Sequence, residues 1–115
     1  MIKVDITLEN HSAENLRDFT LSLGPETTAL PVPATLATQD SFELAAVFLG
    51  NTIHCSLICC SEQTQKTYVA GIQGQKDNHK QVMMSPCLPT QVANSTGICI
   101  NQSSPERYSV FIVFA

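Results

Sequence analysis

Four side chains that could bind a soft metal ion lie within nine positions of one another: His79, Met83, Met84 and Cys87. Imidazole, thioether and thiolate groups are the ligands that copper favours in proteins. A blue-copper site also needs a second histidine soon after the cysteine, and in this chain no histidine follows His79. The ligand set is therefore incomplete, and we predict that the chain binds no metal ion and no other cofactor.

Other candidate chemistry centres on the histidine and cysteines between positions 54 and 60. His54 and Cys55 are neighbours in a segment that we expect to be extended, so their side chains point to opposite faces and cannot share a zinc ion. Nucleophilic catalysis needs a base beside the nucleophile. The sequence has no Gly-x-Ser-x-Gly elbow and no recognisable cysteine–histidine pair. We therefore predict that the chain is not an enzyme; the alternative is a small thiol-dependent enzyme or redox protein that uses Cys59, Cys60 or Cys87.

The cysteine content is typical of a reducing compartment. There are five cysteines, an odd number, and Cys55 and Cys59 would share one face of a strand. They would lie about 13 Å apart at ~3.3 Å per residue, too far for a disulfide. We expect free thiols that serve as small buried apolar groups. A disulfide between Cys87 and Cys99, or from either one to the segment 55–60, is the alternative.

Length and charge exclude several classes of protein. With 115 residues the chain is long enough for one domain, residues 1–115, with its own core. Six basic residues are scattered along a chain of net charge −4, whereas a nucleic-acid binder needs them clustered. No apolar run approaches the roughly 18 residues of a membrane span. The alternating N-terminus is typical of a strand and not of a signal peptide, which predicts a cytoplasmic protein or one exported without a cleaved signal peptide.

The stretch from Phe42 to Cys60 is predicted to be the central element of the fold. Gly50 and Asn51 separate two runs of β-favouring residues and suit a two-residue type II′ turn, with the glycine at positive φ. In the resulting hairpin Phe48 would lie opposite Ile53. One face would be wholly apolar: Phe42, Leu44, Ala46, Phe48, Ile53, Cys55, Leu57 and Cys59. The other would be mixed: Glu43, Ala45, Val47, Leu49, Thr52, His54, Ser56 and Ile58. A helix that ends before Gly50 is the alternative for the first run.

The rest of the chain reads as further strands. Alternation with period two predicts strands at residues 2–9, 16–23, 67–72, 98–101 and 108–115. Two prolines limit residues 30–36 to a very short or an edge strand, and residues 10–15 and 74–81 are predicted to be polar loops. The last strand is apolar on both faces, which places it inside a sheet or at a subunit contact. The pattern predicts an all-β, single-domain antiparallel β-sandwich; a partly closed β-barrel is the alternative.

Residues 4–72 resemble the small cytolysin-like β-sandwiches of the aegerolysin and actinoporin type. The matching pieces, in chain order, are Val4-x-Ile6, Asn10-x-Ser12, Leu16, Leu21-Ser22-Leu23-Gly24, Pro31-Val32-Pro33, Thr35-Leu36 and a strand that opens at Phe42. The resemblance implies a β-sandwich that recognises a lipid or sterol membrane surface, sometimes with a pore-forming partner. The chain departs from this pattern because it has no tryptophan, only two tyrosines and no basic face for anionic lipid.

The mixed face of the predicted hairpin carries the functional hypothesis. It is too apolar for bare solvent and too polar for a core, so a loop or a partner should cover it. We predict a non-catalytic, soluble β-sandwich that acts as a binding or assembly module. Its surface would combine Ala45, Val47, His54 and Ile58 with loops such as residues 73–81. The predicted partner is another protein or a second copy of the chain, membrane lipid is the alternative, and no nucleic acid is expected.

Overall fold

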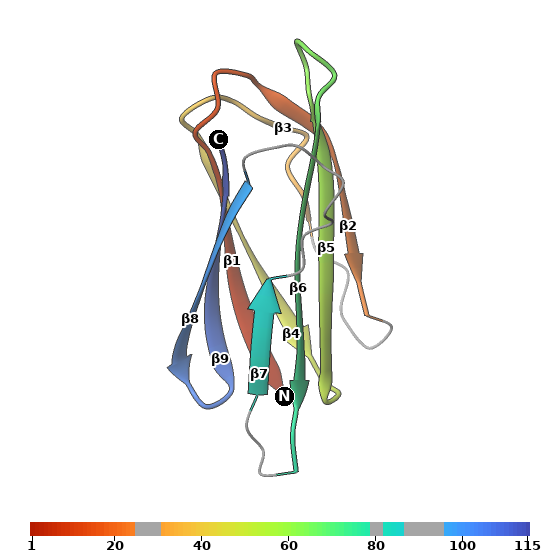
Figure 1. The fold of residues 1–115 in the computed structure, drawn as a ribbon, viewed down its shortest axis with the longest axis vertical. Coiled ribbons are helices and arrows are strands. Elements are labelled where there is room, and N and C mark those ends of the chain that lie inside the picture. Colours follow the sequence, from red (N-terminus) through yellow and green to blue (C-terminus); the bar gives the residue numbers. More distant parts are fainter. Residues whose placement is uncertain (25–30, 79–81, 87–95) are drawn as a thin grey trace.

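The computed structural model of this protein describes residues 1–24, 31–78, 82–86 and 96–115 (Figure 1). Its strands are β1 (Ile2–Asn10), β2 (Leu16–Leu23), β3 (Thr35–Leu36), β4 (Ser41–Phe48), β5 (Thr52–Ser61), β6 (Thr67–Lys76), β7 (Val82–Pro86), β8 (Thr96–Ser104) and β9 (Arg107–Phe114). No helix occurs in these ranges, and so no helix that is long and apolar enough to cross a membrane. The prediction of an all-β fold is confirmed.

Two sheets pack face to face as a β-sandwich. One sheet has four strands in the order β4-β1-β9-β8, and the other has five in the order β3-β2-β5-β6-β7. All pairings in the described residues are antiparallel except that of β1 with β9, which is parallel and joins the first strand to the last. Both sheets end in edge strands, so the fold is a sandwich and not a closed barrel. The C-terminal strand β9 lies inside its sheet, as its two apolar faces predict.

The core lies between the sheets, where the inward side chains of alternate positions meet. Along β1, for example, Ile2, Val4, Ile6 and Leu8 are all buried. Phe114 packs edge-to-face against Tyr68, with ring centroids 5.7 Å apart, and against Phe19 at 6.4 Å. Tyr68 stands on the five-stranded sheet and Phe114 on the other, so this contact joins the two layers.

The predicted hairpin from Phe42 to Cys60 is wrong. β4 pairs with β1 in the four-stranded sheet, whereas β5 pairs with β2 and β6 in the five-stranded sheet. The three residues 49–51 therefore carry the chain across the sandwich from one sheet to the other. No described glycine has a positive φ, so Gly50 does not form a type II′ turn. An arch of this kind and a hairpin bury the same alternate residues, which is why the pattern alone did not separate them.

The inward set predicted for this segment is nevertheless confirmed. Seven of its eight residues are buried, and the eighth, Phe42, is half-buried and packs against the core. The residues of β4 and those of β5 are buried because they face one another across the sandwich, and not because they share one face of a sheet. Alternation fixed which side of each strand is apolar, and the tertiary pairing decided which sheet that side belongs to.

Two strands are longer than predicted. β6 continues to Lys76, so residues 74–76, which were predicted to begin a loop, are paired in the sheet. β8 runs from Thr96 to Ser104, longer than the predicted strand at residues 98–101. Residues 79–81 and 87–95 lie outside the described residues. The segment with two prolines contributes only β3, a two-residue edge strand, as predicted.

A bulge in β2 explains why Leu16 and Phe19 both face the core although three positions separate them. The register with β5 shifts between Arg17 and Thr20, and Asp18 sits in the bulge with φ of 57°. An extra residue in one strand reverses the inward parity from that point on.

Candidate binding face

Much of the outer face of the five-stranded sheet carries uncharged side chains. Cross-strand pairing arranges them in four rows: Thr20, Ile58 and Val69; Ser22, Ser56 and Gly71; His54, Gln73 and Ser85; and Thr52, Gln75 and Met83. We call this set the outer row surface. None of its side chains is that of an aspartate, glutamate, lysine or arginine. The adjoining row of the same face pairs Arg17 with Cys60 and Cys60 with Thr67. Nε of Arg17 lies 3.6 Å from Oδ2 of Asp18 in the β2 bulge.

The middle of the outer row surface is shallow because the side chains of its residues are short. Ser22, Ser56 and Gly71 lie side by side on three paired strands, and none has a side chain longer than a hydroxymethyl group. Ile58 lies on one side of this row and is 44% exposed. On the other side stands His54, whose neighbour across the ladder is Gln73. The surface therefore offers an apolar group and several hydrogen-bonding groups on either side of a shallow middle.

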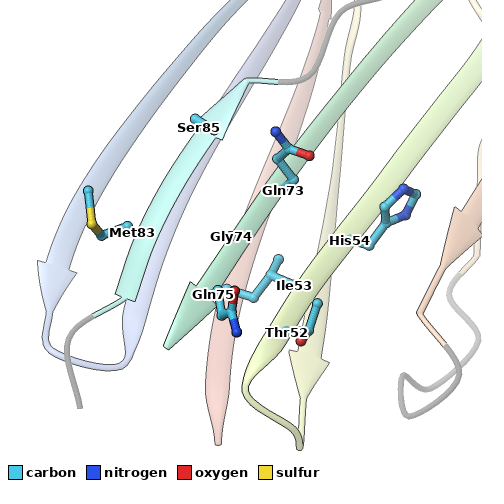
Figure 2. Close-up of a pocket in the computed structure, with 8 residues that line it drawn as sticks. All are labelled: Thr52, Ile53, His54, Gln73, Gly74, Gln75, Met83 and Ser85. Carbon is cyan, nitrogen blue, oxygen red and sulfur yellow. The ribbon is translucent and has the colours of Figure 1, made fainter. Parts of the chain in front are cut away.

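A pocket of about 360 Å³ opens at the β7 end of this surface (Figure 2). It is lined by Thr52, Ile53, His54, Gln73, Gly74, Gln75, Met83 and Ser85, which come from β5, β6 and β7. Its polar groups are hydroxyls, amides and one imidazole. The side chains of His54, Gln73 and Ser85 make no hydrogen bond to any described residue, so their donors and acceptors are available to a ligand.

Gly74 shapes the floor of the pocket. A Cβ at this position would lie 2.8 Å from the carbonyl oxygen of Met83 and 3.2 Å from the Cα of Met84. Both are backbone atoms of β7, so a side chain at position 74 would push β7 away from β6. A glycine here permits the close approach of the two strands that form the pocket wall.

The imidazole of His54 and the hydroxyl of Ser85, both in the described lining of the pocket, lie in one row but apart. His54 and Ser85 are the only base and hydroxyl in one row, but Gln73 stands between them. Two strand spacings place them about 9–10 Å apart, beyond the reach of a hydrogen bond. The described lining groups therefore offer hydrogen-bond donors and acceptors to a ligand.

The predicted interaction surface is divided between the two sheets. His54 and Ile58 stand on the outer face of β5, and both belong to the outer row surface. Ala45 and Val47 stand on β4, on the outer face of the other sheet. The surface was predicted as one face because the hairpin would have placed both strands in one sheet. The structure brings His54 and Ile58 together with Gln73 and separates them from Ala45 and Val47.

The predicted soft-ligand residues are only partly described. His79 and Cys87 lie outside the described residues. Met83 and Met84 are adjacent on β7, so they point to opposite faces: Met83 is 76% exposed and Met84 packs against the core. Within the described ranges no group of three or more histidine, cysteine or acidic residues could hold a metal ion.

The cysteines divide according to face. Cys55 and Cys59 point into the core, and burial raises the pKa of the Cys55 thiol to about 11 and that of Cys59 to about 12. The second value includes a smaller contribution from the neighbouring thiol of Cys60. Cys60 points outward, where its Sγ donates to Oδ2 of Asp18 at 3.4 Å, and Cys99 is exposed on β8. The four described cysteines are all free thiols.

Comparison with known proteins does not assign the site. No family model matches the chain, and no curated protein matches its sequence. Gln73 and Gln75 fall in the range 73–81 that was predicted to join the surface as a loop, but they stand on strand β6. Ser85, on β7, is the residue of this pocket row that sequence reasoning missed. Extending the alternation of Tyr68, Ala70 and Ile72 to Gly74 would have placed both glutamines on the outer face.

Proposed function

We propose that this protein is a small non-catalytic β-sandwich that binds a protein partner through the outer row surface. The observation that supports the proposal is the lack of aspartate, glutamate, lysine and arginine side chains on its four rows, in a chain of net charge −4. The centres of protein interfaces are depleted in charged residues, because burying an unpaired charge is costly. An uncharged surface of this kind can be covered without that cost.

The partner chemistry follows from the groups on the surface. Ile58 and Met83 supply exposed apolar area at its two ends. Between them the hydroxyls, amides and imidazole can donate and accept hydrogen bonds. No phenylalanine, tyrosine or tryptophan side chain lies on the four rows, so the flat stacking on these rings that sugars favour is not available. These features fit an uncharged, partly apolar protein segment.

A displayed library of random peptides tests the proposal. Selection on the native protein should enrich uncharged peptides that carry apolar anchors, and binding should shift the amide resonances of β5 and β6. Ser56→Arg would place a long charged side chain in the low middle row and should weaken binding at least about tenfold.

Ser109→Arg is a matched control, because both serines are half-buried, face outward and stand on strands inside their sheets. It should leave binding unchanged. Failure to enrich any peptide, or equal binding by the Ser56→Arg protein and the wild type, would contradict the proposal.

Lipid recognition, implied by the cytolysin resemblance, stays a separate prediction. Co-sedimentation with vesicles of phosphatidylcholine, of phosphatidylcholine with sterol, and of phosphatidylcholine with sphingomyelin distinguishes it from peptide binding. A protein that binds peptides on the outer row surface, and that stays in the supernatant with all three vesicles, has the proposed function and not the alternative.

A further inference from the structure

The edge strand β8 differs from the other sheet edges. β3 has two residues and β7 has five, including Pro86. β4 is long but carries Glu43 on its outer face. β8 has nine residues without a proline or a charged side chain, and in the described ranges it pairs only with β9. Natural edge strands are usually blunted by charge, proline or shortness, and β8 has none of these protections.

An open edge specifies the kind of partner that it accepts. Within the described residues the N–H and C=O groups on its outer edge have no ladder partner, and another extended strand would satisfy them together. We propose that β8 pairs antiparallel with β8 of a second copy of this chain, about a two-fold axis through Cys99. The two four-stranded sheets would then form one continuous sheet of eight strands. This surface is distinct from the outer row surface and does not depend on the function proposed for it.

The register follows from the inward side chains of β8. Ile98 and Ile100 are only half-buried and pack at the rim of the core. With the axis at Cys99, Ile98 of each copy lies opposite Ile100 of the other, so all four isoleucines gain an apolar neighbour. An axis at Ile100 would set Ile98 opposite Gln102, and an axis at Ile98 would set Ile100 opposite Thr96. The axis at Cys99 therefore gives the best cross-strand pairs.

Charge and irregularity in the strand agree with this register. Pairing about Cys99 uses residues 96–102, which contain no charged side chain, so two copies of a protein with net charge −4 meet without like charges at the contact. The ladder with β9 shifts between Gln102 and Ser104, which is where the new pairing would end. On β4 the equivalent axis at Ala45 would set Glu43 opposite apolar Val47. Uncharged β8 is thus the better edge for self-pairing.

The proposed contact between the two β8 strands is small, so we expect its affinity to be low. Seven residues from each copy are few compared with the roughly 20–30 on each side of a stable interface. We therefore expect a dimer that depends on concentration. Sedimentation velocity of the full chain, from about 10 μM to about 1 mM, should show monomer converting to dimer in this range.

A pair of exposed lysine substitutions tests which edge is used. Cys99→Lys would place two lysines directly opposite each other at the axis and should raise the dissociation constant at least about tenfold. Ala45→Lys, on the outer face of β4 at the other edge of the same sheet, is the matched control and should leave it unchanged. A wild type that is monomeric throughout overturns the proposal. So does a dimer that persists in the Cys99→Lys protein, or one that is lost in the Ala45→Lys protein.

Cross-linking provides a readout that does not require a lysine variant to fold. In antiparallel pairs the facing Cα atoms lie about 4.5–5.5 Å apart, within disulfide range. With Cys60→Ser and Cys87→Ser in the background, oxidation by copper phenanthroline should link two chains through Cys99. The yield should rise with protein concentration and vanish with Cys99→Ser. If Cys99 gives no covalent dimer at about 1 mM, the two-fold axis is not at this residue.

Discussion

The polar residues around Asn10 and those around Gln73 differ in where their hydrogen bonds go. Asn10 is fully buried at one end of the sandwich, and its Nδ2 donates to the carbonyl oxygens of Glu14 and Leu36 at 2.8 and 2.9 Å. Its Oδ1 accepts from the backbone N–H of Ser12 at 3.0 Å and from the hydroxyl at 2.6 Å. Gln73 stands exposed on the outer face of β6, and its side chain bonds to no described residue.

The difference separates polar groups that hold the fold from those that are free to bind. Asn10 ties the β1–β2 connection to β3, and the hydroxyl of Thr38 extends this network by donating to the carbonyl of Ser12. Every bond of the Asn10 side chain is made within the protein. The groups of His54, Gln73 and Ser85 form their bonds with solvent or with a ligand. Substitutions at Asn10 and at His54 and Gln73 test this distinction, and the buried thiols and an exposed ion pair give effects of intermediate size.

Asn10→Ala should destabilise the fold by about 2–4 kcal/mol, because it leaves buried carbonyls and the N–H of Ser12 without partners. Urea denaturation followed by circular dichroism measures the free energy of unfolding. Asn101→Ala is the control: this asparagine is exposed, and its loss should cost less than about 0.5 kcal/mol. Equal effects at the two positions would show that the network around Asn10 does not stabilise the fold.

The buried thiols should make stability fall at alkaline pH. Burial raises the pKa values of Cys55 and Cys59 above the 9.0 of an ordinary thiol, so the folded state favours the protonated thiols. Their contribution is complete below about pH 9 and is lost as the pH rises through 11 and 12. Between pH 8 and pH 10 the free energy of unfolding should drop by about 1 kcal/mol for each thiol.

The double variant Cys55→Ala, Cys59→Ala lacks these groups and serves as the control for other titrating residues. Its free energy of unfolding should fall less between pH 8 and pH 10, although it is lower throughout because of the cavities. A thiol reagent at pH 8 should modify Cys60 and Cys99 but neither buried cysteine of the native protein. Rapid labelling of Cys59 would instead support the thiol-dependent alternative.

Removal of an exposed ion pair should have a smaller effect. Arg107 contacts Oδ2 of Asp5 through Nη2 at 3.1 Å and through Nε at 3.2 Å, on the outer face of the four-stranded sheet. Asp5→Asn should cost about 0.2–1 kcal/mol in low salt, and less as salt screens the pair. A double-mutant cycle with Arg107→Gln isolates the interaction. A coupling that does not weaken with salt would show that the pair is more shielded than its exposure indicates.

His54→Ala and Gln73→Ala should change the free energy of unfolding least, by less than about 0.5 kcal/mol each, because neither side chain bonds to a described residue. Under the proposed function, the same variants should weaken the binding of the selected peptides. A loss of stability as large as that of Asn10→Ala would show that these side chains stabilise the fold, as Asn10 does.

Alternation predicted much of the fold but not the site. The strands at β1, β2 and β9 and the inward set of β4 and β5 follow from the side-chain period of two, which is a local property. The candidate face depends on which strands lie together, and β5 acquires Gln73 and Ser85 as neighbours only through β6 and β7. Asn10 was predicted to begin a polar loop, and its burial was not predicted. That burial depends on a hydrogen bond to the carbonyl of Leu36, which lies 26 positions away in the sequence.

The sequence by itself determined that the chain is all-β and which side of each strand is apolar. It did so because neighbouring side chains on an extended strand must point in opposite directions. Only the tertiary structure decided that β4 and β5 belong to different sheets and that β1 lies beside β9. Those pairings depend on the packing of segments as far apart as the two ends of the chain. The same choice separated His54 and Ile58 from Ala45 and Val47, because two strands that bury the same residues can face each other across a core as well as share one sheet.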